Sequence, residues 1–400
     1  MKYSIHFFIR LWIRLTSYFF FEKIEVSGIE NLPLEGPVIL ASNHPDAFLD
    51  SLVMTTCIKR SFYYTARGDA FKSKTAAGLL DYIQILPLYR REEGKELMHK
   101  NNDTFSNCLK IFKKNGAVSI FSEGISENEW ALRPLRKGTA RIAFEAWNNP
   151  EIGDRLKVVP VVIHYSSWLK ICPRVYIEFL ENIEKKSFEG ITENGTLNKL
   201  FNEKLNLLLS EKCVIVDKSD AASVQNKMVG FLLKNFNDGT KTARRIQDKY
   251  LTEGNEKFKT DYFTLSEFLV KENITYYRKS AVGVITFIFS SLVFVFAYLL
   301  NALPYFISKS IARKTTKGND FHDSVLYCTL LLIYPVYLIA FFFILKIYAS
   351  LWLGISFVAV SLICAALYEG AKRNINCFFK KEKLKTAKQL LNQLFETSNG

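Results

Sequence analysis

Short apolar runs alternate with amphipathic segments over roughly residues 22–180 of this 400-residue chain. Residues 38–42 (VILAS) form such a run and end abruptly at polar residues, which is typical of a buried strand. Similar runs predict strands over residues 61–67, 84–90, 117–124, 157–165 and 174–180. Apolar positions at helical spacing predict helices over residues 71–80, 104–114 and 138–147. The alternation indicates an α/β layered domain with a central mixed sheet flanked by helices.

The composition changes between about residues 181 and 280, where Lys, Glu and Asn become frequent. Apolar residues recur there at helical spacing, as at Leu197, Leu200, Phe201, Leu205 and Leu208. We expect a helical region here, and we find no motif in it that carries chemistry.

Three long apolar stretches follow, at residues 281–300, 324–345 and 348–367. One helical crossing of a bilayer requires about 20 apolar residues, and a soluble core does not need three consecutive stretches of this length. Residues 281–369 are therefore predicted to form membrane-embedded helices, and residues 370–400 a basic cytoplasmic tail.

Basic residues before the second stretch and after the third stretch complicate the topology. Lys372, Arg373 and Lys380 favour a cytoplasmic tail, while Lys309 and Arg313 also favour a cytoplasmic connection after the first stretch. One hypothesis is that the first stretch enters and leaves on the same side, with a break at residues 301–304. Only the last two stretches would then cross, as a hairpin, with the catalytic domain on the cytoplasmic face.

Residues 1–21 are rich in aromatic side chains, and Arg10 and Arg14 interrupt their apolar character. No small-residue cleavage site follows, which does not favour a signal peptide. We expect an interfacial helix lying on the membrane surface. A helix packed on the protein core is the alternative.

The formal net charge of +14 favours anionic partners, such as a phospholipid membrane or coenzyme A. The basic residues are scattered, and neither a zinc-finger spacing nor an RNA-binding aromatic motif is present, so we expect no nucleic-acid partner. Seven Cys without a C-x-x-C motif indicate reduced thiols. We find no metal-ligand spacing and expect no metal.

The segment NHPDAFLD places His44 directly after a predicted strand and Asp50 near a predicted helix start. Histidine titrates near neutral pH and can accept a proton from an alcohol, and a carboxylate on the other ring nitrogen would orient it. Asp46 is a rival for that orienting role. Taken alone, His44 has a second interpretation as a capping or surface histidine.

Further polar residues follow other predicted strands. Glu123 and Gly124 end the run AVSIFSEG, and Arg90 and Arg91 follow QILPLY. Open α/β sheets bind ligands at the carboxyl ends of their strands, and guanidinium groups suit phosphate. Three further basic candidates are Arg67, Arg136 and Lys137.

The order of NHPDAFLD, LPLYRR, FSEG, PLRKGTARIAF and VVPVVIHY resembles the glycerolipid acyltransferase superfamily over roughly residues 22–180. That superfamily includes glycerol-3-phosphate and 1-acylglycerol-3-phosphate acyltransferases. Its usual motif has four residues between His and Asp, whereas five separate His44 from Asp50. The longer spacing resembles the glycerol-3-phosphate/dihydroxyacetone-phosphate branch. Ser122 stands where the family usually has proline.

The resemblance implies an O-acyltransferase in phospholipid biosynthesis that uses acyl-CoA or acyl-carrier protein as donor and no further cofactor. His44 would act as general base, with Asp50 orienting it. Arg90, Glu123 and Gly124 would belong to the site of a phosphate-bearing acceptor. Arg67, Arg136 and Lys137 are weaker candidates for phosphate or coenzyme A, and Pro160 would shape the acyl side.

Two alternatives remain open. The acceptor would be another lysophospholipid or lipid alcohol, or the chain would be a catalytically inactive membrane scaffold. A serine hydrolase is disfavoured because no G-x-S-x-G motif is present.

Overall fold

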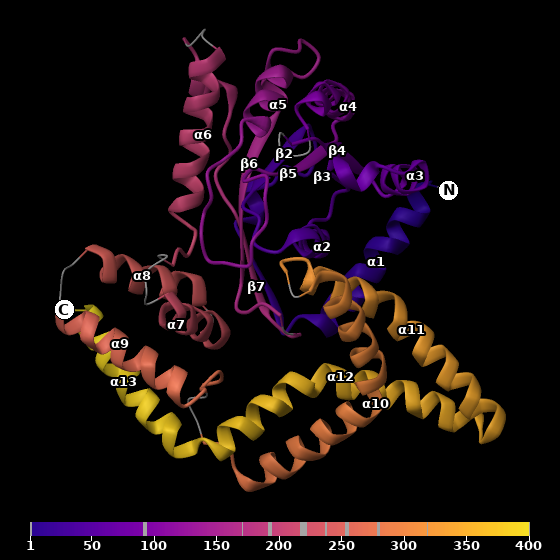
Figure 1. Ribbon diagram of the computed structural model, residues 1–400, viewed down its shortest axis with the longest axis vertical. Helices are drawn as coiled ribbons and strands as arrows, with labels where there is room; N and C mark the ends of the chain where they lie inside the picture. The colour runs from indigo at the N-terminus through magenta and orange to yellow at the C-terminus, as the bar shows by residue number, and fades with distance from the viewer. Residues whose placement is uncertain are drawn as a thin grey trace. The chain divides into compact units, whose positions relative to one another are not determined.

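In the described part of the chain, a seven-stranded sheet has the order β1-β7-β6-β2-β5-β3-β4 (Figure 1). The computed structural model describes residues 2–90, 94–169, 171–190, 194–216, 222–236, 238–252, 256–277, 281–317 and 319–399. The strands are β1 (Lys23–Ser27), β2 (Val38–Ser42), β3 (Tyr63–Arg67), β4 (Ile85–Leu88), β5 (Ala117–Phe121), β6 (Lys157–Tyr165) and β7 (Arg174–Phe179).

Helices separate most of these strands and follow the last one. The α-helices of the first half are α1 (Lys2–Phe20), α2 (Ala47–Cys57), α3 (Lys74–Tyr82), α4 (Asn101–Lys113), α5 (Gly138–Trp147) and α6 (Asn194–Ser210). Short 3-10 helices are η1 (Ile29–Asn31), η2 (Gly68–Phe71), η4 (Lys95–Lys100), η5 (Gly153–Arg155) and η6 (Lys185–Phe188).

The central strands run parallel. β2 pairs with β5 and β6, and β3 pairs with β4 and β5, all in parallel. In this register Ser42, the last residue of β2, lies opposite Phe121, the last residue of β5. β6 and β7 are joined by only eight residues, too few for a parallel crossover, so the sheet is mixed, as the sequence predicts.

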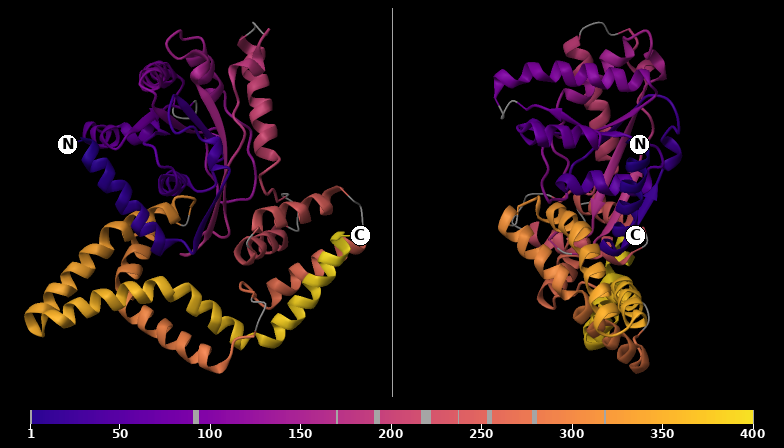
Figure 2. Two further views of the ribbon diagram at one scale, coloured as in Figure 1. Left: turned by 180° about the vertical axis from the view of Figure 1, so that it is seen from behind. Right: turned by 90° about the vertical axis from the view of Figure 1, so that its right-hand side faces the viewer.

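Apolar side chains of one sheet face pack against α4, α5 and α6 (Figure 1). This core includes Ile39, Ile120, Phe112, Trp147 and Phe201. α2 lies on the side of the sheet away from α6 in both views (Figures 1 and 2). β2 and β5 are buried along their whole length, because both of their faces are covered, which explains their continuous apolar sequences.

Up to about residue 180, the predicted strands and helices are confirmed with two differences. β1 is not among the predicted strands, because its sequence KIEVS is only partly buried and carries two charged residues. The helix expected over residues 71–80 begins later, as α3, after the 3-10 helix η2. The chain forms two compact units: residues 1–11, 25–164 and 176–213 in the first, and 12–24, 165–175 and 214–400 in the second.

The second unit is helical over most of its length. Its helices are α7 (Ala222–Asn235), α8 (Gly239–Thr252), α9 (Glu256–Lys271), α10 (Val284–Thr316), α11 (His322–Tyr348), α12 (Leu351–Phe379) and α13 (Lys381–Asn399). α13 packs along α9, and α7 packs on both α8 and α9 (Figure 2).

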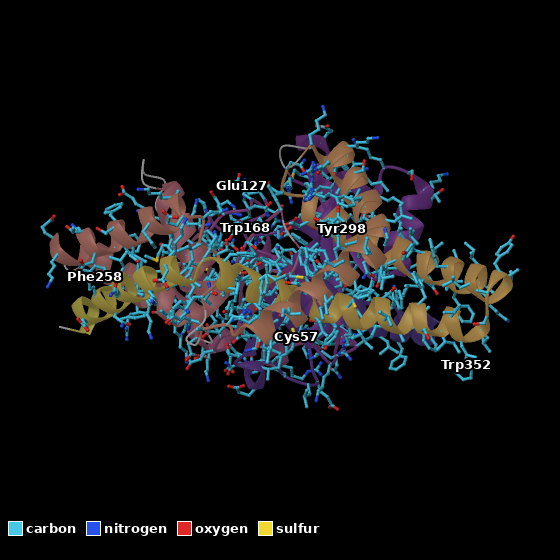
Figure 3. All side chains as sticks on the ribbon, turned by 90° about the horizontal axis from the view of Figure 1, so that it is seen from below. Cys57, Glu127, Trp168, Phe258, Tyr298 and Trp352 are labelled. Carbon is cyan, nitrogen blue, oxygen red and sulfur yellow. The ribbon has the colours of Figure 1, made fainter. Side chains whose placement is uncertain are left out.

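Within the described residues, α10, α11 and α12 are the three helices long and apolar enough to cross a membrane. They pack on one another, and many of their large apolar side chains are exposed. Trp352, at the start of α12, is 75% exposed and stands at the far end of the α11–α12 pair (Figure 3). This arrangement is compatible with membrane association.

α10 differs from the sequence expectation, because it continues through residues 301–304 without the expected break. Pro304 cannot donate a hydrogen bond to the carbonyl of Leu300. The hydroxyl of Tyr337 on α11 donates to that carbonyl instead, at 2.7 Å. A neighbouring helix thus satisfies the acceptor that proline leaves open, which is how apolar surroundings tolerate proline within a helix.

Candidate active site

His44 and Asp50 form a close pair after the carboxyl end of β2. The Nδ1 atom of His44 lies 2.8 Å from Oδ2 of Asp50, which lies in the first turn of α2. The Asp50 side chain is fully buried, whereas 11% of the His44 side chain surface is exposed. An Nδ1–H donated to a carboxylate leaves Nε2 with a lone pair that can accept a proton.

Asp46, the rival for the orienting role, contacts Asp50 through its backbone. Its backbone N–H donates to Oδ2 of Asp50 at 3.0 Å, and its carbonyl accepts from the backbone N–H of Asp50 at 3.3 Å. The turn between His44 and α2 therefore supports the Asp50 carboxylate through the Asp46 backbone. The structure thus pairs His44 with Asp50 despite the longer spacing.

The imidazole is also held from the neighbouring strands. The ring of Phe121, at the end of β5, stacks on the His44 ring with centroids 3.9 Å apart. The Asn43 amide donates to the carbonyl of Ile163 at 3.0 Å and accepts from its N–H at 2.8 Å. β5 and β6 thereby fix both the ring plane and the backbone of this loop.

Glu123 follows β5 by two residues, and its side chain is fully buried. Its Oε2 atom is 3.0 Å from Nε of Arg133. Burial raises the pKa of Glu123 to about 7, although Arg133 and the backbone N–H groups of His44 and Arg133 act in the opposite direction. Asp50 adds to the rise by charge repulsion.

Gly124 adopts a left-handed conformation, with φ of +73°. A Cβ atom at this position would lie only 2.8 Å from Cγ of Arg136. The backbone N–H of Arg136 donates to the carbonyl of Ser122 at 2.7 Å, and that of Ser122 donates to the carbonyl of Ser42 at 2.9 Å. Glycine therefore lets the Arg136 side chain cross the turn after β5, close to the end of β2.

The other basic candidates lie at the end of β3, after β4 and before α5. Arg90 follows β4 by two residues and is partly buried. Arg67, at the end of β3, is exposed and forms an ion pair with Asp69 at 2.5 Å. Lys137 is exposed at the start of α5, and Arg91 lies outside the described residues. Because β2, β3, β4 and β5 run parallel, their carboxyl ends lie at the same end of the sheet.

Three residues around His44 were not predicted as site residues: Asn43, Phe121 and Arg133. Asn43 and Phe121 lie inside the motifs NHPDAFLD and FSEG. Their closeness in the sequence to His44 and Glu123 could have identified them as site residues. Arg133 precedes PLRKGTARIAF and has no local signal that distinguishes it from a surface arginine. Among the described residues, no group of three or more His, Cys, Asp or Glu could hold a metal ion.

The family model described as Acyltransferase matches residues 23–164. That segment contains the paired strands, the His44–Asp50 pair and the turn at Glu123–Gly124. This match supports, over this domain, the resemblance to the glycerolipid acyltransferase superfamily that the motifs indicate.

Two curated relatives are 1-acyl-sn-glycerol-3-phosphate acyltransferases of chloroplasts, BAT2 from Brassica napus and LPAT1 from Arabidopsis thaliana. Each is 27% identical over 139 residues, which is 34% of this chain and 38% or 37% of the relative. The chain thus matches little more than a third of their length. The crystal structure of the 1-acyl-sn-glycerophosphate acyltransferase PlsC from Thermotoga maritima is also similar. Its TM-score is 0.38 at 17% identity, covering 52% of this chain and 81% of that one.

Proposed function

We propose that the chain is a membrane-bound O-acyltransferase of phospholipid biosynthesis. It transfers a fatty acyl group from acyl-CoA or acyl-carrier protein to a hydroxyl of glycerol-3-phosphate or 1-acylglycerol-3-phosphate. The observation that carries this proposal is the 2.8 Å contact between His44 and the buried Asp50 within an acyltransferase domain. The three long apolar helices support attachment to a membrane.

In the proposed reaction, Nε2 of His44 removes the proton of the acceptor hydroxyl while Asp50 stabilises the imidazolium that forms. The acceptor oxygen attacks the carbonyl carbon of the thioester. The carbon–sulfur bond then breaks, and the leaving thiolate takes the proton back from His44. Backbone N–H groups at the strand ends would stabilise the oxyanion, where one donor is commonly worth about 10²–10³ in rate.

Arg90 is the preferred phosphate contact, with Arg136 next to it in rank. A guanidinium can bind a phosphate with two parallel hydrogen bonds, and Arg136 crosses Gly124 at the edge where His44 lies. We place the catalytic domain on the cytoplasmic face, because basic residues follow the last apolar helix.

The acceptor distinguishes this proposal from its alternatives. The names of the two plant relatives favour 1-acylglycerol-3-phosphate, while the spacing between His44 and Asp50 favours glycerol-3-phosphate. Membranes containing the protein would be assayed with labelled acyl-CoA and with labelled acyl-carrier protein. The acceptors would be these two, a lysophospholipid without a terminal phosphate, and a simple lipid alcohol.

His44→Ala tests the general base, and we expect it to lower turnover by about 10²–10⁴-fold at an unchanged protein level. His99→Ala is the control, because His99 is exposed and bonds only to the Glu96 carbonyl among the contacts described. Full turnover in His44→Ala would remove His44 as base. Transfer only to acceptors without phosphate would reject the proposed acceptor class.

A further inference from the structure

The guanidinium of Arg133 contacts four acceptor groups next to His44 and Glu123. Its Nε lies 3.0 Å from Oε2 of Glu123, and its Nη1 donates to Oε1 of Glu129 at 3.1 Å. Its Nη2 donates to the backbone carbonyls of His44, at 3.1 Å, and Glu127, at 3.2 Å. One guanidinium therefore joins the loop that carries the imidazole to the segment after β5.

Both members of the central ion pair are buried. Arg133 is 9% exposed, and Glu123 is 1% exposed. Removing two charges from water is costly, and replacing such a pair by apolar residues is often neutral for stability. An arginine retained here is thus poorly explained by stability alone, whereas its planar fork can hold several acceptors in one fixed geometry.

A second contact joins the same two segments. The side-chain amide of Asn128 donates to the carbonyl of Pro45 at 2.9 Å. Pro45 follows His44 directly, so two consecutive carbonyls of the catalytic loop accept hydrogen bonds from the segment between β5 and α5. Each nitrogen of the Arg133 guanidinium already faces a protein acceptor, which does not suit a direct contact with substrate phosphate.

We propose that Arg133 is a positioning residue that, together with Glu123, locks the loop of His44 so that its imidazole keeps the orientation needed for acyl transfer. This inference rests on the proposed function of His44. Glu123 then acts through the loop backbone and through Arg133. Arg133 differs from Asp50 because it holds the loop backbone of His44, and Asp50 holds the ring.

The first test compares Arg133→Met, which keeps the length of the side chain, with Arg133→Lys. We expect Arg133→Met to lower kcat about 10–10²-fold per folded enzyme, with the acceptor KM unchanged within about two-fold. Lysine should restore part of kcat, because an ammonium can pair with Glu123 but cannot reproduce the fork to the His44 carbonyl. An unchanged kcat in both variants, or a rise confined to KM, would overturn the proposal.

The second test uses the pH dependence of kcat/KM in Glu123→Gln, with Glu129→Gln as the matched control. Glu123 faces Arg133, Asp50 and the backbone N–H of His44, and Glu129 pairs with the same arginine from a more exposed position. Above about pH 7, where Glu123 is ionised, Glu123→Gln removes its negative charge and leaves the Arg133 charge without this partner beside the His44 loop. The kcat/KM of Glu123→Gln relative to wild type should therefore fall as the pH rises through about 7, and the corresponding ratio for Glu129→Gln should stay constant.

These measurements also separate the inference from the function on which it rests. If His44→Ala is inactive while Arg133→Met and Glu123→Gln behave as wild type, the positioning role fails and the general base stands. If His44→Ala is fully active, the proposed function itself fails. If Arg133→Met does not fold, Arg133→Lys and Glu123→Gln test the proposal in its place. A wild-type kcat in Arg133→Lys together with a wild-type pH dependence in Glu123→Gln would then reject it.

Discussion

The Oδ2 atom of Asp50 receives two donors, Nδ1 of His44 at 2.8 Å and the backbone N–H of Asp46 at 3.0 Å. The carboxylate belongs to the first turn of α2, and the backbone at Asp46 belongs to the turn that leads into this helix. The start of α2 thus brings the acid back toward the imidazole across five intervening residues. Asp46 contributes to this geometry through its main chain.

Asp50→Asn and Asp46→Asn should therefore differ strongly in activity. The amide in place of Asp50 cannot stabilise an imidazolium and favours the wrong tautomer, so kcat should fall by about 10²–10⁴-fold. Asp46→Asn keeps the backbone donor, and we expect less than about a ten-fold loss. Turnover of both variants, normalised to protein level, checks this. Equal losses would contradict the assignment of Asp50 as the orienting acid.

Arg90→Ala should chiefly weaken binding of a phosphate-bearing acceptor. We expect the acceptor KM to rise about ten-fold or more, because a charge-assisted bidentate contact is lost, with a smaller change in kcat. Arg155→Ala is a matched control at the opposite end of the parallel strands, where Arg155 bonds to Asn115 at 3.0 Å. An acceptor KM that is the same in the two variants would exclude Arg90 as the phosphate contact.

Asn43→Ala should lower both the stability and the activity of the protein. The substitution leaves the N–H and carbonyl of Ile163 without their partners, at a cost of about 1–3 kcal/mol, and it frees the loop before His44. Asn31→Ala removes one comparable hydrogen bond, to the Phe179 carbonyl, away from the site. Melting temperature and kcat would be measured together. A loss of kcat in Asn31→Ala as large as in Asn43→Ala would refute a specific role for Asn43.

The titration of Glu123 should make folding stability depend on pH. Burial raises its pKa from 4.5 to about 7 in the folded protein, which therefore holds the proton more tightly than the unfolded chain. This contribution favours the folded state below about pH 4.5 and is lost as the pH rises through about 7. Glu123→Gln lacks this titration.

The melting temperature of wild type minus that of Glu123→Gln should thus decrease between about pH 5 and pH 8. Thermal unfolding of both proteins in the same detergent, at a fixed scan rate, checks the direction. A difference that instead grows with pH would mean that Arg133 holds the pKa of Glu123 below its ordinary value.

The sequence alone determined most of the strands and helices of the first 180 residues. Val38–Ser42, Lys157–Tyr165 and Gly138–Trp147 were predicted with the bounds that the structure has. The two strands are apolar runs that end at polar residues, and the helix has apolar positions at helical spacing, so the local pattern marks each element. His44, Asp50 and Glu123 were predicted as site residues from their places near the ends of such strands, because parallel strands bring their carboxyl ends to one edge.

Only the tertiary structure decided which groups meet. The sequence favoured Asp50 and left Asp46 as a rival, and the turn into α2 brings Asp50 to His44. Arg133 lies 89 residues from His44, and nothing local distinguishes it from a surface arginine. Pro304 would end a helix by local rules, yet the hydroxyl of Tyr337 satisfies the carbonyl that it leaves open. In each case the deciding partner comes from a distant segment, and local patterns carry no information about such partners.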